Sequence, residues 1–328
     1  MGYVNLGRTG VKVSRLALGC GNFGGIGSMP EFFGRGETME EAFAIMDAAF
    51  YLGINLFDTA NAYGGGASEH MIGQWLASRG SAVRDQLLIS TKVFNPVGPG
   101  PNDCGLSRRH LLSQVDISLS RLGVDYLDLF LLHEPDPSTP LEESLSTLND
   151  LVHAGKVRYV GASNMPAWLT AKALWLADTH GWCRIEWIQN SYSLLERKDE
   201  VELFPLLADQ GLGFTPFSPL AGGWLTGKYQ ADQPFPPGSR MTLRSDPYQH
   251  LLKADVFAGL ERLRAFAESR GTDTATLSLA WLLHQPRVTS VIMGPRRPTH
   301  LEPGLQALEI ELTPSECEEM ASFFIAEP

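Results

Sequence analysis

The sequence predicts an α/β protein of the (β/α)8 barrel (TIM barrel) class, with residues 1–328 in a single domain. Eight short runs of apolar and β-branched residues recur along the chain, and helical patterns separate them. These runs are nearly continuous rather than alternating, as expected for parallel strands that are covered on both faces. No linker, low-complexity segment or block of like charge divides the chain. Eight strand-then-helix units in a chain of this length indicate one closed barrel.

The predicted strands follow one another at regular intervals. They are residues 15–20, 54–60, 87–93, 126–133, 157–164, 184–192, 212–219 and 289–294. Helical spacing fills the segments between them, for example in residues 39–53, 107–123 and 140–155. Ser107 and Pro140 are typical helix starts, and Gly123 and Gly155 are typical helix ends.

Three segments lie outside the eight units. Residues 3–14 read as two short strands around a glycine-containing turn, a hairpin that we expect to plug the barrel floor. Residues 219–250 form a long loop after the seventh strand, rich in glycine and proline, and a loop of that length is more often functional than idle. Residues 313–324 read as a final helix.

Composition limits the classes of function. With 44% hydrophobic residues and a formal net charge of −11, the chain is a globular protein without an obvious basic face for nucleic acid or anionic lipid. No apolar run reaches the roughly 20 residues that span a bilayer. The N-terminus lacks a secretory signal layout, and Leu6 occupies the place where a myristoylation motif has Ser or Thr. The four cysteines are widely scattered. We therefore expect a soluble cytoplasmic protein with free thiols and no metal site.

Four titratable residues interrupt apolar runs where predicted strands end. Asp58 and Tyr63 follow the second strand, Lys92 ends the third, and His133 ends the fourth. The loops after barrel strands meet at one mouth, so these side chains are expected to converge there. Each residue alone also has an ordinary structural explanation, such as a turn cap or a core histidine. The complementary chemistry of the four together favours a catalytic set.

The chemistry of this set is proton donation. A tyrosine keeps its proton at neutral pH and can act as a general acid, and a neighbouring ammonium lowers the pKa of the phenol. We assign that task to Lys92. A desolvated ammonium needs a partner, and Asp58 is the natural one. His133 is expected to orient a substrate oxygen beside Tyr63. The set can protonate a carbonyl oxygen, but it needs a separate hydride donor.

The motifs DTANAYGGGASE, STKV and LLHEPD resemble the Asp, Tyr, Lys and His tetrad of the aldo-keto reductases, in the same order. The resemblance runs from LGRTGVKVSRLALG to VIMGPRRPTHL and includes GKVRYVGASN, WIQNSYSLLER and PFSPLAGGWLTGKY. The long loop is similar to the branch that contains bacterial sugar and aldehyde reductases and potassium-channel β subunits. The resemblance implies NADPH-dependent reduction of a small carbonyl compound, with Tyr63 as general acid.

The resemblance also implies a cofactor site. Ser163, Asn164 and Gln189 match residues that hold the nicotinamide amide, and Phe217 matches the aromatic residue that stacks on the ring. Small residues at the end of the first strand let the backbone approach the cofactor. The remaining matches are Gly19, Cys20, Gly21 and Asp58, the pyrophosphate segment Ser218, Pro219, Leu220, Ala221 and Gly222, the basic residues Lys228 and Arg240, and the adenosine-phosphate residues Gly294, Arg296 and His300.

The run GPRRPTH is locally cationic in an acidic chain and leads into a helix N-terminus, a favourable place for a phosphate. An arginine fork binds phosphate in a bidentate manner, so Arg296 predicts a preference for NADPH over NADH. One departure concerns the adenine. Pro303 and Gly304 replace the Glu-Asn pair that commonly contacts it, so the adenine end is expected to be held differently.

Three alternatives compete with this interpretation. GCGNFG at residues 19–24 fits a dinucleotide-binding fingerprint, but that motif needs a helix at its third glycine, and no helix signal precedes Thr38. A hydrolase on the same barrel would need paired histidines or carboxylates that this chain lacks. The third alternative is an NADPH-binding sensor with little turnover, which the resemblance to channel β subunits suggests and the intact tetrad disfavours.

The substrate depends on three rim loops, residues 22–37, 94–106 and 219–250. Sugars, ketones, aldehydes and unsaturated carbonyls all fit the predicted chemistry. No feature of the sequence indicates an oligomeric state. Candidates for the pocket wall are Met29, Phe32, Phe33, Phe94 and Trp224.

Overall fold

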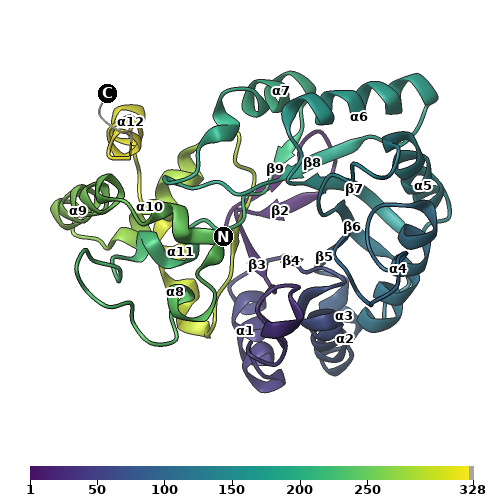
Figure 1. Cartoon of the computed structure of the whole chain (residues 1–328), viewed down its shortest axis with the longest axis horizontal. Coiled ribbons are helices and arrows are strands. Elements are labelled where there is room, and N and C mark those ends of the chain that lie inside the picture. Colours follow the sequence, from purple (N-terminus) through teal and green to yellow (C-terminus); the bar gives the residue numbers. More distant parts are fainter. Residues whose placement is uncertain (325–328) are drawn as a thin grey trace.

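The computed structural model describes residues 1–324 and is built around eight parallel strands (Figure 1). Their order in the sheet is β10-β3-β4-β5-β6-β7-β8-β9, so each strand lies beside its neighbour in the chain and the last lies beside the first. Every strand falls within its predicted range, which confirms the (β/α)8 barrel. The strands are β3 (Leu16–Gly19), β4 (Leu56–Asp58), β5 (Leu88–Val93), β6 (Leu127–Leu132), β7 (Val157–Ser163), β8 (Ile185–Gln189), β9 (Gly213–Phe214) and β10 (Val291–Met293).

The barrel closes between β9 and β10 through single hydrogen bonds rather than a regular ladder. The backbone N–H of Thr289 donates to the carbonyl of Phe214 over 2.8 Å, and that of Ile292 donates to Pro216 over 3.0 Å. Pro216 has no N–H to return, so β9 stops after two residues. This explains why the predicted strand 212–219 is much longer than the observed one.

The helices pack outside the sheet and begin and end largely where the sequence indicated. Thr38 and Glu41 form a capping box at α1, and Thr313 and Glu316 form another at α12. Gly123 ends α4 in a left-handed conformation. The helices are α1 (Met39–Tyr51), α2 (Ala67–Arg79), α3 (Ser81–Arg84), α4 (Arg108–Leu122), α5 (Leu141–His153), α6 (Ala167–His180), α7 (Leu203–Gln210), α8 (Arg240–Leu243), α9 (Ala254–Ser269), α10 (Thr274–His284), α11 (Glu302–Ala307) and α12 (Pro314–Ser322).

The predicted N-terminal hairpin is present and plugs the barrel. Strands β1 (Tyr3–Asn5) and β2 (Lys12–Ser14) pair in antiparallel fashion. Leu6 and Val13 are fully buried in one cluster with inward-facing strand residues such as Leu129 and Leu131. The apolar end of the barrel interior is therefore sealed by this hairpin, and polar strand residues occupy the other end.

The predicted loop 219–250 contains short helical turns and packs against the loop after β3. Its turns are Ala221–Thr226, α8 and Asp246–Leu251. Arg240 donates to the side-chain oxygen of Asn22 over 3.2 Å, and Arg244 donates to the carbonyl of Ile26 over 3.2 Å. Helices α8 to α12 lie together on one side of the barrel in Figure 1.

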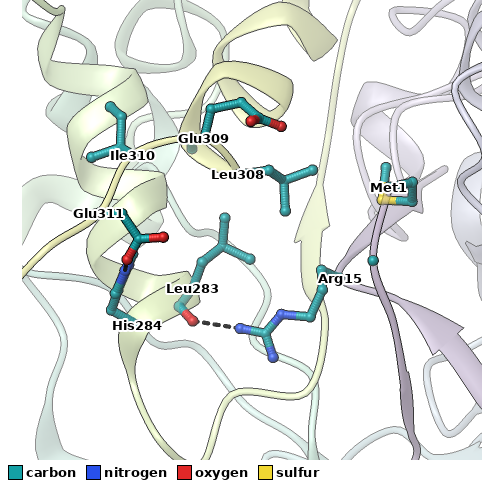
Figure 2. Close-up of a pocket in the computed structure, with 10 residues that line it drawn as sticks. Met1, Arg15, Leu283, His284, Leu308, Glu309, Ile310 and Glu311 are labelled. Atoms are coloured by element: carbon teal, nitrogen blue, oxygen red, sulfur yellow. Dashed lines mark hydrogen bonds and ion pairs between the residues drawn. The ribbon is translucent and has the colours of Figure 1, made fainter.

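A crevice of about 310 Å³ opens near the N-terminus, at the end of the barrel where the strands begin (Figure 2). Arg15 reaches across it to the carbonyl oxygen of Leu283 and donates to that of Val288 over 2.9 Å. These bonds attach the start of β3 to the end of α10. No helix among residues 1–324 is long and apolar enough to cross a membrane. The four cysteines are free thiols, as predicted.

Candidate active site

The turn between β4 and α2 brings Tyr63 back over the strand end that carries Asp58. Tyr63 begins a 3₁₀ turn, and Gly64, Gly65 and Gly66 follow with φ of 59°, 69° and 99°. Residues with a Cβ rarely adopt three such φ angles in succession. The three glycines therefore permit the tight turn that brings Tyr63 back beside Asp58, as the sequence suggested. Helix α2 starts immediately afterwards, at Ala67.

Buried polar contacts hold this turn in place. Arg121 of α4 donates to the carbonyl oxygen of Asn61 over 2.8 Å and to the buried carboxylate of Glu69 over 3.1 Å. Glu69 also accepts from the hydroxyl of Thr91 over 2.7 Å. The turn that carries Tyr63 is therefore tied to both β5 and α4.

Lys92 and Asp58 form a buried ion pair inside the barrel. Lys92 is fully buried, and its Nζ lies 2.6 Å from Oδ2 of Asp58 and 2.7 Å from the carbonyl oxygen of Thr59. The other oxygen of Asp58 accepts from Ser90 Oγ over 2.8 Å and from Gln189 Nε2 over 3.0 Å. The carboxylate is thus satisfied on both oxygens, as a buried charge requires.

The ammonium of Lys92 lies beside Tyr63, with Nζ 5.2 Å from the centroid of the phenol ring. Burial alone would lower the pKa of Lys92, but Asp58 and Tyr63 together raise it, so the side chain stays charged. Burial raises the pKa of Tyr63, and Lys92 opposes that effect without reversing it. The charge of Lys92 thus acts on the pKa of Tyr63 in the expected direction, but the pKa stays above its ordinary value because desolvation of the phenolate outweighs the nearby charge.

His133 completes the cluster on the other side of the phenol. Its Nε2 lies 3.3 Å from the Tyr63 hydroxyl, and its Nδ1 lies 3.1 Å from Nδ2 of Asn95. Burial, followed by the charge of Lys92, holds the pKa of His133 well below its ordinary value, so the ring is neutral at pH 7. The structure thus links all four predicted catalytic residues through consecutive contacts.

The residues predicted to hold the nicotinamide amide lie beside this cluster. Ser163 and Gln189 are paired positions of β7 and β8, and Gln189 bonds directly to Asp58. Asn164 has a left-handed backbone, with φ of 55°, and its Nδ2 donates to Glu134 over 2.8 Å and to the carbonyl of His133 over 3.0 Å. Because its amide nitrogen is already used, Oδ1 of Asn164 is the atom that can accept a bond from a ligand amide.

The segment predicted to hold the pyrophosphate has an unusual backbone. Four non-glycine residues within the described chain have positive φ, and three of them are predicted cofactor contacts: Asn164, Ser218 and Ala221. Gly222 and Gly223 continue the left-handed run with φ of 64° and 96°. Successive residues of this kind turn backbone N–H groups toward a common concavity, which suits an anion. Phe217 precedes this segment, and Pro219 and Leu220 lie within it, between Ser218 and Ala221.

Basic side chains converge next to that segment. Burial, and then repulsion from Arg240 and Arg296, lowers the pKa of Lys228. Burial likewise lowers the pKa of His300, and Arg297, Lys228 and Arg296 add to the effect. Cations that repel one another in this way are stabilised by a bound polyanion. The fold therefore brings Lys228, Arg240, Arg296 and His300 together, and this group of side chains suits an anion.

Arg296 is held by a carboxylate that sequence reasoning missed. Its Nε donates to Oε1 of Glu37 over 2.8 Å, and the side chain of Glu37 is 2% exposed. Burial raises the pKa of Glu37, and Arg296 opposes the shift. Nothing in the sequence pairs positions 37 and 296, because the contact depends on how the loop after β3 folds over the barrel.

The glycine-rich stretch after β3 is a turn rather than a dinucleotide fingerprint. Gly19 ends β3, and Cys20 donates its backbone N–H to the carbonyl of Asp58 over 2.8 Å. A Cβ on Gly21 would lie 3.5 Å from the ring of Tyr63, so this segment passes directly beside the phenol. The next α-helix starts only after Thr38, as predicted. A Cβ on Gly294, after β10, would meet no atom within 4 Å, so the space beside this predicted cofactor contact is open.

The predicted pocket-wall residues divide into two groups. Phe33 is 37% exposed and packs on Gly65, next to Tyr63, and Met29 and Phe94 are also at least partly accessible. Trp224, in contrast, is fully buried and packs among Tyr229, Phe235 and Phe257. Trp224 therefore stabilises the segment after β9 and does not line the mouth. Phe32 is 9% exposed and lies under the guanidinium of Arg244.

Pro303 and Gly304 have a structural role at the start of α11. Pro303 occupies the first turn of the helix, and a Cβ on Gly304 would overlap the sulfur of Met293. The close approach of α11 to β10 thus requires glycine here. Within residues 1–324, no group of three or more His, Cys, Asp or Glu side chains is arranged to hold a metal ion.

Comparison with known proteins agrees with this geometry. Residues 15–324 match the model of the aldo/keto reductase family. The chain is 38% identical to the oxidoreductase YrpG of Bacillus subtilis over 95% of this chain and 92% of that protein. It is 39% identical to L-glyceraldehyde 3-phosphate reductase of Escherichia coli O157:H7 (94% and 88%) and 36% identical to a probable voltage-gated potassium channel subunit beta of Arabidopsis thaliana (94% and 92%). The chain therefore belongs to the aldo/keto reductase family and is an NAD(P)H-dependent oxidoreductase.

Proposed function

We propose that this protein reduces an aldehyde or ketone to an alcohol, with NADPH as the reductant and Tyr63 as the general acid. The observation that carries the proposal is the buried chain of contacts from Asp58 through Lys92 and Tyr63 to His133. The cluster places a proton donor, Tyr63, between a charged ammonium, Lys92, and a neutral imidazole, His133. That combination suits a carbonyl oxygen that gains negative charge in the transition state.

Each residue has a distinct task in this scheme. Tyr63 gives its proton to the carbonyl oxygen, and Lys92 stabilises the phenolate that remains until solvent returns the proton. Asp58 keeps Lys92 charged and in place, and His133 holds the carbonyl oxygen near the phenol. When bound, the dihydronicotinamide supplies the hydride that forms the new C–H bond at the carbonyl carbon.

The residues that would hold the cofactor run across the barrel mouth. Ser163, Asn164 and Gln189 would bind the nicotinamide amide, and Phe217 would stack on the ring. The segment from Ser218 to Gly222, in which Ser218, Ala221 and Gly222 have positive φ, would bind the pyrophosphate with its backbone, and Lys228 and Arg240 would neutralise it. Arg296 and His300 would bind the 2′-phosphate.

Removing the phenol hydroxyl tests the general acid. Tyr63→Phe is expected to lower kcat by roughly 10²-fold or more, because the transition state loses its proton donor. NADPH affinity, measured by the change in protein fluorescence, should stay nearly the same. Tyr51→Phe, the same change at a largely exposed tyrosine, is the matched control. Normal turnover by Tyr63→Phe would overturn the assignment.

Removing the Arg296 guanidinium tests the preference for NADPH. Arg296→Ala should lower kcat/KM for NADPH by about tenfold or more, the cost of losing hydrogen bonds to a charged group. The value for NADH should change little, because NADH lacks the 2′-phosphate. Arg109→Ala, at an exposed position of α4, serves as the control. An unchanged ratio between the two cofactors would refute the role of Arg296.

The substrate class is best approached by a panel of carbonyl compounds assayed through NADPH consumption. The panel should contain sugars, ketones, aromatic aldehydes, unsaturated carbonyls and glyceraldehyde 3-phosphate, which the name of the Escherichia coli relative suggests. The similarity to a potassium channel subunit favours a second candidate, an NADPH-binding sensor. Tight NADPH binding without turnover of any compound in the panel would favour the sensor over the reductase.

A further inference from the structure

Asn95 lies three residues after Lys92, in the loop between β5 and α4, and its side chain is half-buried against the ring of His133. The two nitrogens of His133 face different neighbours. Nδ1 lies 3.1 Å from Nδ2 of Asn95, and Nε2 lies 3.3 Å from the hydroxyl of Tyr63. The imidazole is therefore held between the two side chains.

With Nδ2 of Asn95 facing the ring, the contact indicates which nitrogen of His133 carries the proton. The Nδ2 group of an asparagine can only donate a hydrogen bond, so Nδ1 of His133 must accept one and carries no proton. A neutral imidazole has a single N–H, and that N–H is then on Nε2. The side chain of Asn95 thus selects the tautomer whose N–H points to Tyr63.

The tautomer sets the direction of the hydrogen bond between His133 and Tyr63. With the proton on Nε2, the imidazole donates, and the proton of the phenol stays available for a substrate oxygen. With the proton on Nδ1, Nε2 would accept the phenol proton and draw it away from the substrate. A substrate oxygen can accept from both groups only in the first arrangement.

The surroundings of His133 keep the ring neutral, so the tautomer rather than the charge matters. Lys92 of β5 places a cation nearby, and burial and that charge both oppose protonation of the ring. The other titratable groups of this corner are Asp58, which is paired with Lys92, the phenol of Tyr63, and the half-buried Glu134 that follows β6. None of the hydrogen bonds in the described chain gives Nδ1 a carboxylate partner.

We propose that Asn95 is a positioning residue, which holds His133 as the Nε2–H tautomer and so directs the proton of Tyr63 toward the substrate. The role rests on the proposed function, since it concerns the same reaction. Asn95 acts only through His133.

Asn95→Asp is the sharpest test because it keeps the shape and reverses the hydrogen bond. The new carboxylate accepts a hydrogen bond from Nδ1–H, which places the ring proton on Nδ1, and its charge raises the pKa of His133. Above that pKa the neutral ring has no proton on Nε2, and kcat should fall roughly 10²-fold, the usual cost of losing one donor to a developing oxyanion. Below it the ring is charged and regains an Nε2–H. The ratio of variant to wild-type kcat should therefore rise as pH falls.

Two further variants separate this effect from damage to the loop. Asn95→Leu removes the donor without adding a carboxylate, so it should lower kcat without the new pH dependence. Asn5→Asp makes the same substitution at an exposed position of the N-terminal hairpin, away from the mouth, and should behave as the wild type. An Asn95→Asp profile that is parallel to the wild type at all pH values would overturn the proposal.

Nitrogen-15 NMR of histidine-labelled protein gives a readout that does not require turnover. His133 is identified among the eight histidines by comparison with His133→Asn. The wild type should show a bare Nδ1 and a protonated Nε2, and Asn95→Asp should show the reverse at high pH. A protonated Nδ1 in the wild type would refute the role of Asn95 whether or not the protein reduces carbonyls. Absence of turnover with the expected tautomer would refute the proposed function alone.

Discussion

Glu134 is the half-buried carboxyl group next to His133, and it accepts a hydrogen bond from Asn164 over 2.8 Å. Burial raises its pKa from 4.5 to about 6. The folded protein therefore holds the Glu134 proton more tightly than the unfolded chain does. The protonated form contributes stability fully below pH 4.5, and this contribution is lost as the pH rises through about 6.

Replacing this carboxyl group should remove that pH dependence. Relative to Glu134→Gln, the wild type is expected to lose about 1 kcal/mol of unfolding free energy between pH 4.5 and pH 7, a value reduced for partial exposure. Urea unfolding at the two pH values measures the difference. Glu309→Gln, at an exposed position, is the control. If wild type and Glu134→Gln change equally with pH, burial does not perturb this carboxyl group.

The residues of the candidate site differ in how well they can be predicted from the sequence. Asp58, Lys92 and His133 could be predicted because each is a charged or titratable residue in an apolar run, and a barrel brings strand ends together. Asn95 and Glu37 could not. They sit in polar loops, where asparagine and glutamate are common, and only the folded contacts with His133 and Arg296 distinguish them. The direction of the pKa shift of Tyr63 could not be predicted from the sequence either, because it depends on how burial of the phenol compares with the charge of Lys92.

At the level of elements, a close helix contact near the site joins α2 and α4. Gly73 of α2 lies against the backbone of α4. A Cβ at this position would lie 2.9 Å from the carbonyl carbon of Leu122 and would overlap the carbonyl oxygen of Arg121. Backbone atoms cannot move aside as a side chain can. Arg121, at this same contact, is the residue that holds the Tyr63 turn.

Gly73→Ala should therefore push the two helices apart. We expect a loss of about 1–3 kcal/mol in unfolding free energy, typical of overpacking, although alanine by itself favours a helix over glycine. Chemical denaturation provides the measurement. Gly10→Ala, where a Cβ would meet no atom within 4 Å, should stay within about 0.5 kcal/mol of the wild type. Equal stability of the two variants would show that α2 and α4 can separate freely.

Elements were predictable to the extent that local signals define them. The caps at Thr38, Ser107 and Thr313 mark helix starts that the structure confirms. Strand ends were less predictable, because a residue such as Pro216 leaves the ladder where the barrel closes. The turns within residues 219–250 depend on contacts with the loop after β3, so no local pattern shows them.

At the scale of the whole molecule, positively charged side chains gather in one place although the chain as a whole is acidic. The chain carries a net charge of −11, yet Lys228, Arg240, Arg244 and Arg296 gather at one side of the mouth. Burial, and then Arg244 and Arg296, lower the pKa of Arg240, whereas Tyr248 opposes them. A cationic corner on an acidic protein attracts polyanions. The sequence indicated the basic residues Lys228 and Arg240 in one segment and Arg296 in another, and the fold brings the two segments together.

The left-handed backbones of Asn164, Ser218 and Ala221 have a consequence for stability. Each is a conformation that costs of order 1 kcal/mol or more in a residue with a Cβ, so packing and hydrogen bonds elsewhere must compensate for it. The fold therefore gives up stability at the three residues for which we propose cofactor contacts.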